Sequence, residues 1–139
     1  MYFYTRLQYI VCSIGSMLVG VCIYLVFRNE SLLVFKWFPF LLTIQDYFTA
    51  KPTVIENINP FIAYNLPDGL WVLSGIFLIR SLWIKNEKIM RGYLCVFSLF
   101  AVIFEVLQLN DNIPGTFDFL DLIVIMLVIL LENIIYRKR

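Results

Sequence analysis

The chain has 139 residues, of which 61% are apolar and only 15% are charged, with a formal net charge of +1. Soluble domains carry about a quarter charged residues, so this composition argues against a soluble protein and indicates a single membrane domain. A net charge near zero without a basic stripe argues against a nucleic-acid partner. The chain has no histidine, the commonest general base and metal ligand, and we expect neither a metal nor another cofactor.

Four segments are long and apolar enough to cross a bilayer, which requires about 20 mostly apolar residues. In chain order they cover residues 7–27, 65–84, 93–109 and 117–136. A cleaved signal peptide is the alternative for the first segment, but no small-residue cleavage site follows it. The sequence therefore predicts an all-α, polytopic membrane protein with four transmembrane helices, in which residues 1–139 form one domain.

The segment between the first two spans is also apolar, but it is interrupted. Residues 31–48, SLLVFKWFPFLLTIQDYF, contain Lys36, Pro39 and Asp46 among several aromatic side chains. Because aromatic residues anchor at the headgroup boundary, we predict an interfacial or re-entrant segment here, with a fifth span as the alternative. The polar stretch that follows, residues 49–60, contains two prolines and predicts a loop.

Charged residues also lie near the C-terminal ends of the second and fourth predicted spans and between the second and third, and their expected positions are simple. Arg80 falls about one turn before the end of the second span, where its long side chain can extend to the membrane surface. The sequence KNEKIMR, residues 85–91, predicts the loop to the third span. Glu132 lies beside the C-terminal RKR, and we expect ordinary pairing at the interface.

The lysines and arginines predict the orientation, since cytoplasmic loops carry an excess of these residues. With four spans, the two termini and the loop at 85–92 lie on one side. That side holds Arg6, Lys85, Lys88, Arg91, Arg137, Lys138 and Arg139. The other side has Arg28, Lys36 and Lys51 over a long loop. Both termini are therefore predicted to be cytoplasmic, and a fifth span would disturb this balance.

This topology brings polar residues from three distant segments to the outer ends of the spans. They are Asp68, Glu105, Gln108, Asp118 and Asp121. At a rise of about 1.5 Å per residue, each lies within about two helical turns of the outer surface. Glu105 and Gln108 are three residues apart and share a helix face, as do Asp118 and Asp121. We predict that these five residues form one site.

Two interpretations of these acids stay open. Asp68 and Asp118 fall in the first turns of their helices, where a carboxylate caps free N–H groups. Glu105 and Asp121 lie in apolar surroundings, where a carboxylate costs about 2.5–3.5 kcal/mol at mid-bilayer. We expect them to face the bundle interior, either protonated or paired with a cation, for which Arg28 is the candidate. They form either a ligand-binding site or a structural lock between helices.

The pattern Glu105-x-x-Gln108, followed by a short loop with Gly115 and then by Phe117-Asp118-x-x-Asp121, resembles the VanZ-like family. These are small bacterial membrane proteins, named for a member that confers low-level teicoplanin resistance. The stretch LPDGLW, with Asp68, is similar to a motif that opens an earlier span in the family. Gly115 and Thr116 stand where the family usually has an arginine. The resemblance implies a multi-pass protein of the bacterial inner membrane, with a role in the cell envelope or in antibiotic resistance.

We therefore predict a protein that binds a polar lipid headgroup, a cell-wall precursor or a glycopeptide-type ligand at an acidic site in the outer leaflet. The alternative is a structural or accessory subunit of a membrane complex whose acids lock the helices. A lipid-modifying enzyme and a small carrier are less favoured, because the sequence has no G-x-S-x-G motif and no polar chain across the spans. The expected partners are membrane lipids, an envelope ligand, and another membrane protein or a second copy.

Overall fold

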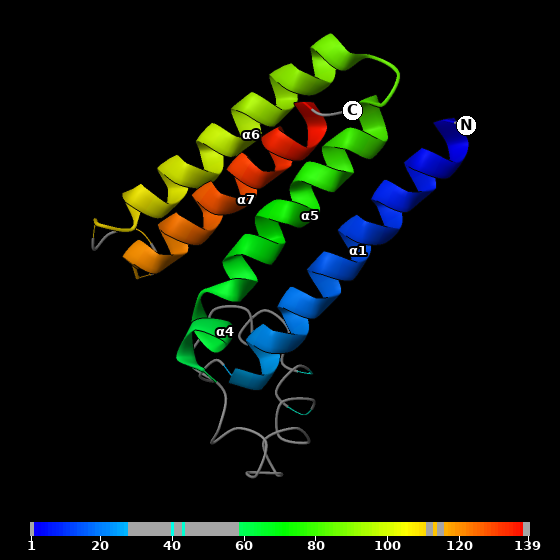
Figure 1. Ribbon diagram of the computed structural model, residues 1–139. Coiled ribbons are helices and arrows are strands. Elements are labelled where there is room, and N and C mark those ends of the chain that lie inside the picture. The colour runs from blue at the N-terminus through cyan, green and yellow to red at the C-terminus, as the bar shows by residue number, and fades with distance from the viewer. Residues whose placement is uncertain are drawn as a thin grey trace.

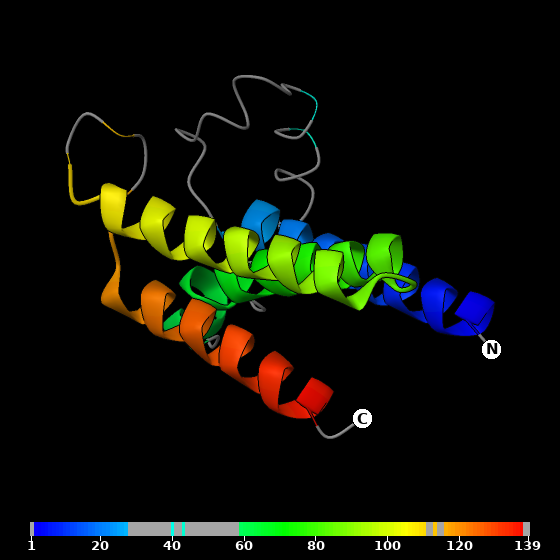
Figure 2. The same ribbon diagram turned by 90° about the horizontal axis from the view of Figure 1, so that it is seen from above.

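The computed structural model describes residues 2–27, 40, 43, 59–110, 113 and 116–137, and each secondary-structure element in these ranges is a helix. The elements are α1 (Tyr2–Phe27), α4 (Pro60–Tyr64), α5 (Leu66–Trp83), α6 (Glu87–Leu107) and α7 (Phe119–Arg137). The long helices α1, α5, α6 and α7 form an elongated bundle in which successive helices run in opposite directions (Figures 1 and 2). The predicted all-α fold is confirmed.

The two ends of the bundle are formed by different parts of the chain. Both chain termini and the turn between α5 and α6 lie at one end, here called the terminal end (Figure 1). At the opposite end, here called the loop end, α1 and α6 finish while α4 and α7 begin. This is the arrangement that the four predicted segments require, since each segment has to return the chain to the end from which the previous one started.

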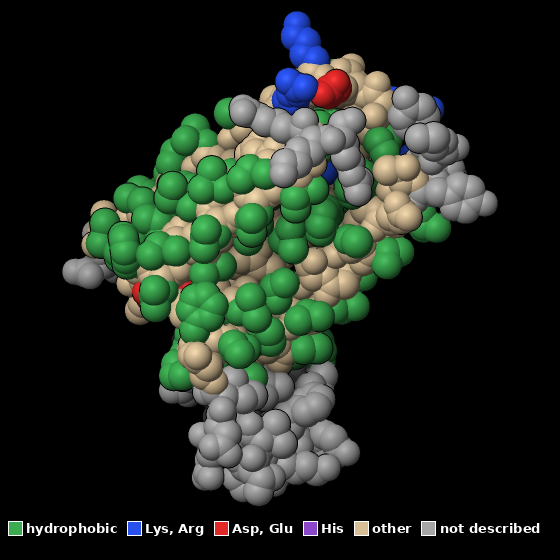
Figure 3. Space-filling model, viewed as in Figure 1, with side chains coloured by type: hydrophobic (Ala, Val, Ile, Leu, Met, Phe, Trp, Pro, Cys, Tyr) green, Lys and Arg blue, Asp and Glu red, His purple; other side chains and the backbone are tan. Residues whose placement is uncertain are grey.

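Three of the long helices have the length and composition of membrane spans. They cover Thr5–Leu25, Glu87–Leu107 and Phe119–Tyr136. Much of their surface is apolar and exposed, for example Val96 and Phe100 on α6, which are 67% and 63% exposed. On the face seen in Figure 3, hydrophobic side chains make up much of the surface between the two ends, and lysine and arginine side chains lie at the terminal end. The protein is therefore a multi-pass membrane protein. α5 is not among these three helices, and it contains Asp68 and Arg80.

α6 begins earlier than the sequence predicted, at Glu87 rather than near residue 93. The cause is local: the Asn86 side chain accepts a hydrogen bond from the Ile89 N–H at 3.2 Å, and Glu87 complements the positive end of the helix dipole. The predicted loop over 85–91 was therefore wrong beyond Asn86, because the charged residues that follow it form the first turns of the helix.

The predicted interfacial segment, residues 31–48, lies outside the described residues except for Phe40 and Thr43. The chain is next described at Asn59, whose side chain caps α4 by accepting a hydrogen bond from the Phe61 N–H at 3.0 Å. Pro60 suits the first turn of this helix because its ring fixes a helical backbone angle. α4 was not predicted, and it places Asn65 at the junction between α4 and α5.

α5 is the central helix, and it contacts α1, α4, α6 and α7. Two glycines allow this close packing. A Cβ atom at Gly69 would lie 2.4 Å from Cγ1 of Val124, and one at Gly75 would lie 2.2 Å from Cζ of Phe97. The buried core around Ile76 lies where α5, α6 and α7 meet. α5 is therefore shielded by its neighbours, whereas much of α1, α6 and α7 is exposed.

α1 is held against α5 by a reciprocal pair of serine hydrogen bonds. The Ser13 hydroxyl donates to the main-chain carbonyl of Ser74, and the Ser74 hydroxyl donates to the carbonyl of Ser13, both at 2.9 Å. Both serines are buried. Small residues with short hydroxyls are typical of close helix contacts in membranes, where polar groups find few other partners.

We expect Ser13→Ala and Ser74→Ala to be coupled, because the two hydroxyl oxygens also lie within hydrogen-bond distance of each other, at 3.2 Å. Hydrogen bonds between helices in membranes contribute about 0.6 kcal/mol on average and up to about 1.7 kcal/mol, so a double-mutant cycle should give a coupling energy in this range. Reversible unfolding in mixed detergent micelles measures it. The control cycle pairs Ser74→Ala with Ser16→Ala on the same helix and should show no coupling. Equal values in the two cycles would contradict the bonding seen here.

Candidate functional site at the loop end

Five polar side chains from three helix ends form one hydrogen-bonded group at the loop end, here called the polar cluster. Its members are Asn65, Glu105, Gln108, Asp118 and Asp121. Asn65 stands at the start of α5, Glu105 and Gln108 at the end of α6, and the two aspartates at the start of α7. Asn65, Glu105 and Asp121 are only 3%, 6% and 7% exposed, so the centre of the cluster is buried. Gln108 and Asp118 are partly buried and form its edge.

Asn65 links α5 to α7. Its side-chain amide donates to Oδ2 of Asp118 at 3.1 Å and to Oδ1 of Asp121 at 2.8 Å. A primary amide has two N–H groups, and both are used here. Because its two acceptors are carboxylates, these bonds are stronger than bonds between neutral groups. One buried asparagine therefore fixes the start of α7 against the start of α5.

Glu105 links α6 to α7 in a similar way. Its Oε1 accepts a hydrogen bond from the main-chain N–H of Asp118 at 3.2 Å, and its Oε2 accepts one from the Gln108 side chain at 3.1 Å. The C-terminal end of a helix disfavours a carboxylate. The N–H groups that point at both of its oxygens offset this cost, and one of them comes from the neighbouring helix.

Asp118 caps α7, as one of the two interpretations of the sequence predicted. Its Oδ1 accepts from the Leu120 N–H at 2.8 Å, and its main-chain carbonyl accepts from the Leu122 N–H at 3.3 Å. Its other carboxylate oxygen accepts from Asn65. The residue is thus both a helix cap and a member of the cluster, and the two interpretations do not exclude each other.

The structure brings together four of the five predicted site residues. The fifth, Asp68, lies partly buried in the first turn of α5, three residues after Asn65. Arg28, the predicted cation partner, lies outside the described residues. Asn65 was missed as a site residue. The available signal was its position at the start of the same apolar segment as Asp68, which places it at the same end of the bundle.

Within the described ranges, no group of three or more histidine, cysteine, aspartate and glutamate side chains is arranged to hold a metal ion.

A second buried polar contact lies toward the terminal end. Arg80 of α5 forms an ion pair with Oε1 of Glu132 on α7, and their side chains are 4% and 10% exposed. The ring centroid of Tyr136 lies 3.7 Å from the guanidinium carbon of Arg80, within the range of a cation–π contact. The prediction that Arg80 extends to the surface was wrong, because a carboxylate on α7 pairs with it inside the bundle. Glu132 likewise pairs across the bundle.

No protein-family model, no curated protein and no solved structure matches this chain. The resemblance to the VanZ-like family therefore rests on the polar positions quoted above and on the order of the helices.

Proposed function

We propose that this protein is a four-span protein of the bacterial inner membrane that binds a polar envelope ligand through the polar cluster. The observation that carries this proposal is the convergence of carboxylates from α6 and α7 with amides from α5 and α6 at one end of the bundle. The ligand class is a molecule rich in hydrogen-bond donors, such as a polar lipid headgroup, a cell-wall precursor or a glycopeptide.

The course of the chain supports α5 as the fourth span. α1 and α6 run in the same direction (Figures 1 and 2), so the chain between them has to return from the loop end to the terminal end. α5 is the helix that makes this return. Its buried arginine is neutralised by Glu132, which lowers the cost of placing α5 in the membrane.

The distribution of positive charge supports the orientation. Lys85, Lys88 and Arg91 lie in or beside the α5–α6 turn at the terminal end, together with both chain termini. An excess of such residues marks the cytoplasmic side. With the terminal end in the cytoplasm, the polar cluster lies at the level of the outer leaflet, where it can meet envelope components.

The chemistry of the cluster favours a ligand that donates hydrogen bonds. A carboxylate has about four lone-pair sites. Glu105 accepts two hydrogen bonds, and Asp118 accepts two through its side chain. Each therefore retains acceptor capacity. An amine, hydroxyl or amide group that approaches past the partly buried Asp118 and Gln108 would meet acceptors that are already held in place. A ligand with a positive charge would gain more than a neutral one.

The test compares wild-type protein with the Glu105→Gln/Asp121→Asn variant by native mass spectrometry from mild detergent, with and without added teicoplanin. We expect the variant to lose co-purified headgroup ligand or to bind the glycopeptide at least about tenfold more weakly, since a bond to a charged group contributes about 1.5–3 kcal/mol. Glu87→Gln, the same chemical change at an exposed position of the terminal end, is the control. Unchanged binding by a well-expressed cluster variant would refute the proposal.

A second candidate is a structural or accessory subunit in which the cluster locks the helices. It is favoured by one observation: both side-chain oxygens of Glu105 and of Asp118 already accept hydrogen bonds from within the chain. In that case the same double variant should unfold at a lower temperature, while ligand retained per folded molecule stays at the wild-type level. The two candidates therefore differ in the amount of ligand bound per folded molecule, and a single preparation of the variant is enough to measure it.

A further inference from the structure

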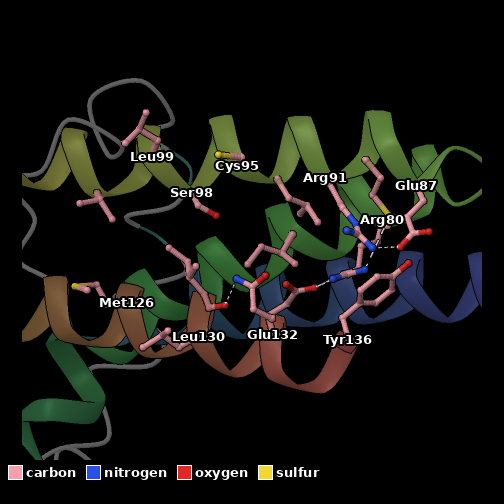
Figure 4. Close-up of a pocket in the computed structure, with 16 residues that line it drawn as sticks. Arg80, Glu87, Arg91, Cys95, Ser98, Leu99, Met126, Leu130, Glu132 and Tyr136 are labelled. Carbon is pink, nitrogen blue, oxygen red and sulfur yellow. Dashed lines mark hydrogen bonds and ion pairs between the residues drawn. The ribbon is translucent and has the colours of Figure 1, made fainter. Parts of the chain in front are cut away.

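A groove of about 1000 Å³ opens between α6 and α7, with α5 as its floor. It extends from the terminal end past the middle of the bundle (Figure 4), and no member of the polar cluster is among its lining residues. Its volume is at the upper end of the range of about 300–1,000 Å³ that is typical of ligand pockets. It is bordered by exposed side chains such as Leu99 and Leu130, which are 60% and 53% exposed, so it is accessible from the surrounding membrane.

The groove is polar at one end and apolar at the other. At the terminal end it is lined by Glu87 and Arg91, which form an exposed ion pair, and by the buried pair of Arg80 and Glu132, with Tyr136 against the Arg80 guanidinium (Figure 4). Toward the middle of the bundle its lining becomes mainly apolar, with Leu94, Leu99, Val102, Met126 and Leu130. Such a division matches an amphiphile with its head at the membrane boundary and its chain directed inward.

We propose that this groove binds an anionic phospholipid of the leaflet at the terminal end, with its phosphate at Arg91 and one acyl chain between α6 and α7. The argument for this occupant is charge complementarity. In the lining, Arg80 and Arg91 are balanced by Glu132 and Glu87, and the excess of positive charge at this end comes from Lys85 and Lys88, which lie beside the groove in the chain. Basic pockets between membrane helices at the cytoplasmic side bind anionic headgroups in this way.

Arg91 is the residue that meets the phosphate. Its side chain is 70% exposed, and one terminal nitrogen pairs with Glu87. A guanidinium has five N–H donors in a planar fork, so the remaining donors can face a phosphate oxygen. Arg80 has a different role. Glu132 and Tyr136 hold its guanidinium in place, and it forms a rigid polar wall at the base of the groove.

The test uses protein reconstituted in vesicles of equal parts phosphatidylglycerol and phosphatidylcholine, then extracted in mild detergent for native mass spectrometry. We expect a phosphatidylglycerol adduct in preference to phosphatidylcholine. Arg91→Gln should lower this preference about fivefold, the effect of one basic residue at a membrane surface. Ser98→Phe, which fills the middle of the groove, should remove both adducts. Leu130→Trp fills the groove from α7, should likewise remove both adducts, and replaces Ser98→Phe in the test if that variant does not fold.

Matched controls distinguish binding in the groove from a general attraction of anionic lipid to the positively charged terminal end. Lys88→Gln removes the same charge three residues earlier on α6, outside the groove lining, and should lower the preference clearly less than Arg91→Gln does. Val96→Phe adds the same ring on the exposed face of α6 and should leave the adduct intact.

Equal effects of Lys88→Gln and Arg91→Gln would overturn the proposal. So would lipid retention by both filled variants, or a dimer that these variants abolish, since a second copy would then occupy the groove. The Glu105→Gln/Asp121→Asn variant should keep the lipid.

Discussion

Replacing Glu132 with leucine is expected to lower the free energy of unfolding by about 3–5 kcal/mol. The substitution leaves the Arg80 guanidinium inside the bundle without its carboxylate, where the side chain is 4% exposed. The charge then has to be desolvated without compensation, or the helices have to separate to admit water. Reversible unfolding in mixed micelles, followed by circular dichroism, measures the loss.

The double variant Arg80→Met/Glu132→Leu should recover most of this stability, because an apolar pair often replaces a buried ion pair without net cost. Glu87→Gln removes a carboxylate from the exposed pair with Arg91. It should change stability by less than about 1 kcal/mol, since exposed ion pairs contribute little. If the double variant were as unstable as Glu132→Leu alone, lost packing rather than an uncompensated charge would be the cause.

Asn65→Leu is expected to destabilise the protein by about 3 kcal/mol or more. Leucine keeps roughly the shape of asparagine but donates no hydrogen bonds, so Asp118 and Asp121 both lose a donor inside a buried cluster. Each hydrogen bond to a charged group contributes about 1.5–3 kcal/mol. The same unfolding measurement reports the effect.

Asn133→Leu is the matched control for this substitution. Asn133 is exposed on α7, and its amide donates to the main-chain carbonyl of Ile129 at 2.9 Å. Its replacement should change stability by no more than about 0.5 kcal/mol, as is usual at surface positions. Equal effects at the two asparagines would mean that Asn65 does not hold the helix ends together.

The helices and the meeting of four site residues could be predicted because the signals are local or follow from topology. Each long apolar run is visible by itself, and alternating direction brings the end of α6 and the start of α7 to the same end of the bundle. The start of α6 was misplaced for a different reason. The charged residues after Asn86 favour a loop between the second and third spans, whereas the asparagine cap and Glu87 start a helix there.

Two side chains could not be predicted because their environments depend on distant segments. Asn65, taken by itself, is an ordinary residue at a helix start, and only the approach of α7 makes it a bridge between two carboxylates. Arg80 is near the end of α5, which predicts exposure, until Glu132 is placed opposite it.

The groove between α6 and α7 also depends on how two helices separate, which apolar periodicity does not encode. The interfacial segment at 31–48 stays a prediction.

The ion pair between α5 and α7 has a consequence for how the protein is made. Glu132 follows Arg80 by 52 residues, so the arginine leaves the ribosome well before its partner. At about 5–20 residues per second, this delay is about 3–10 s. During this interval Arg80, in the last turn of α5, has no carboxylate opposite it and has to direct its guanidinium toward the membrane surface. Arg80 therefore reaches its buried position only after α7 has been made and has brought Glu132 against α5.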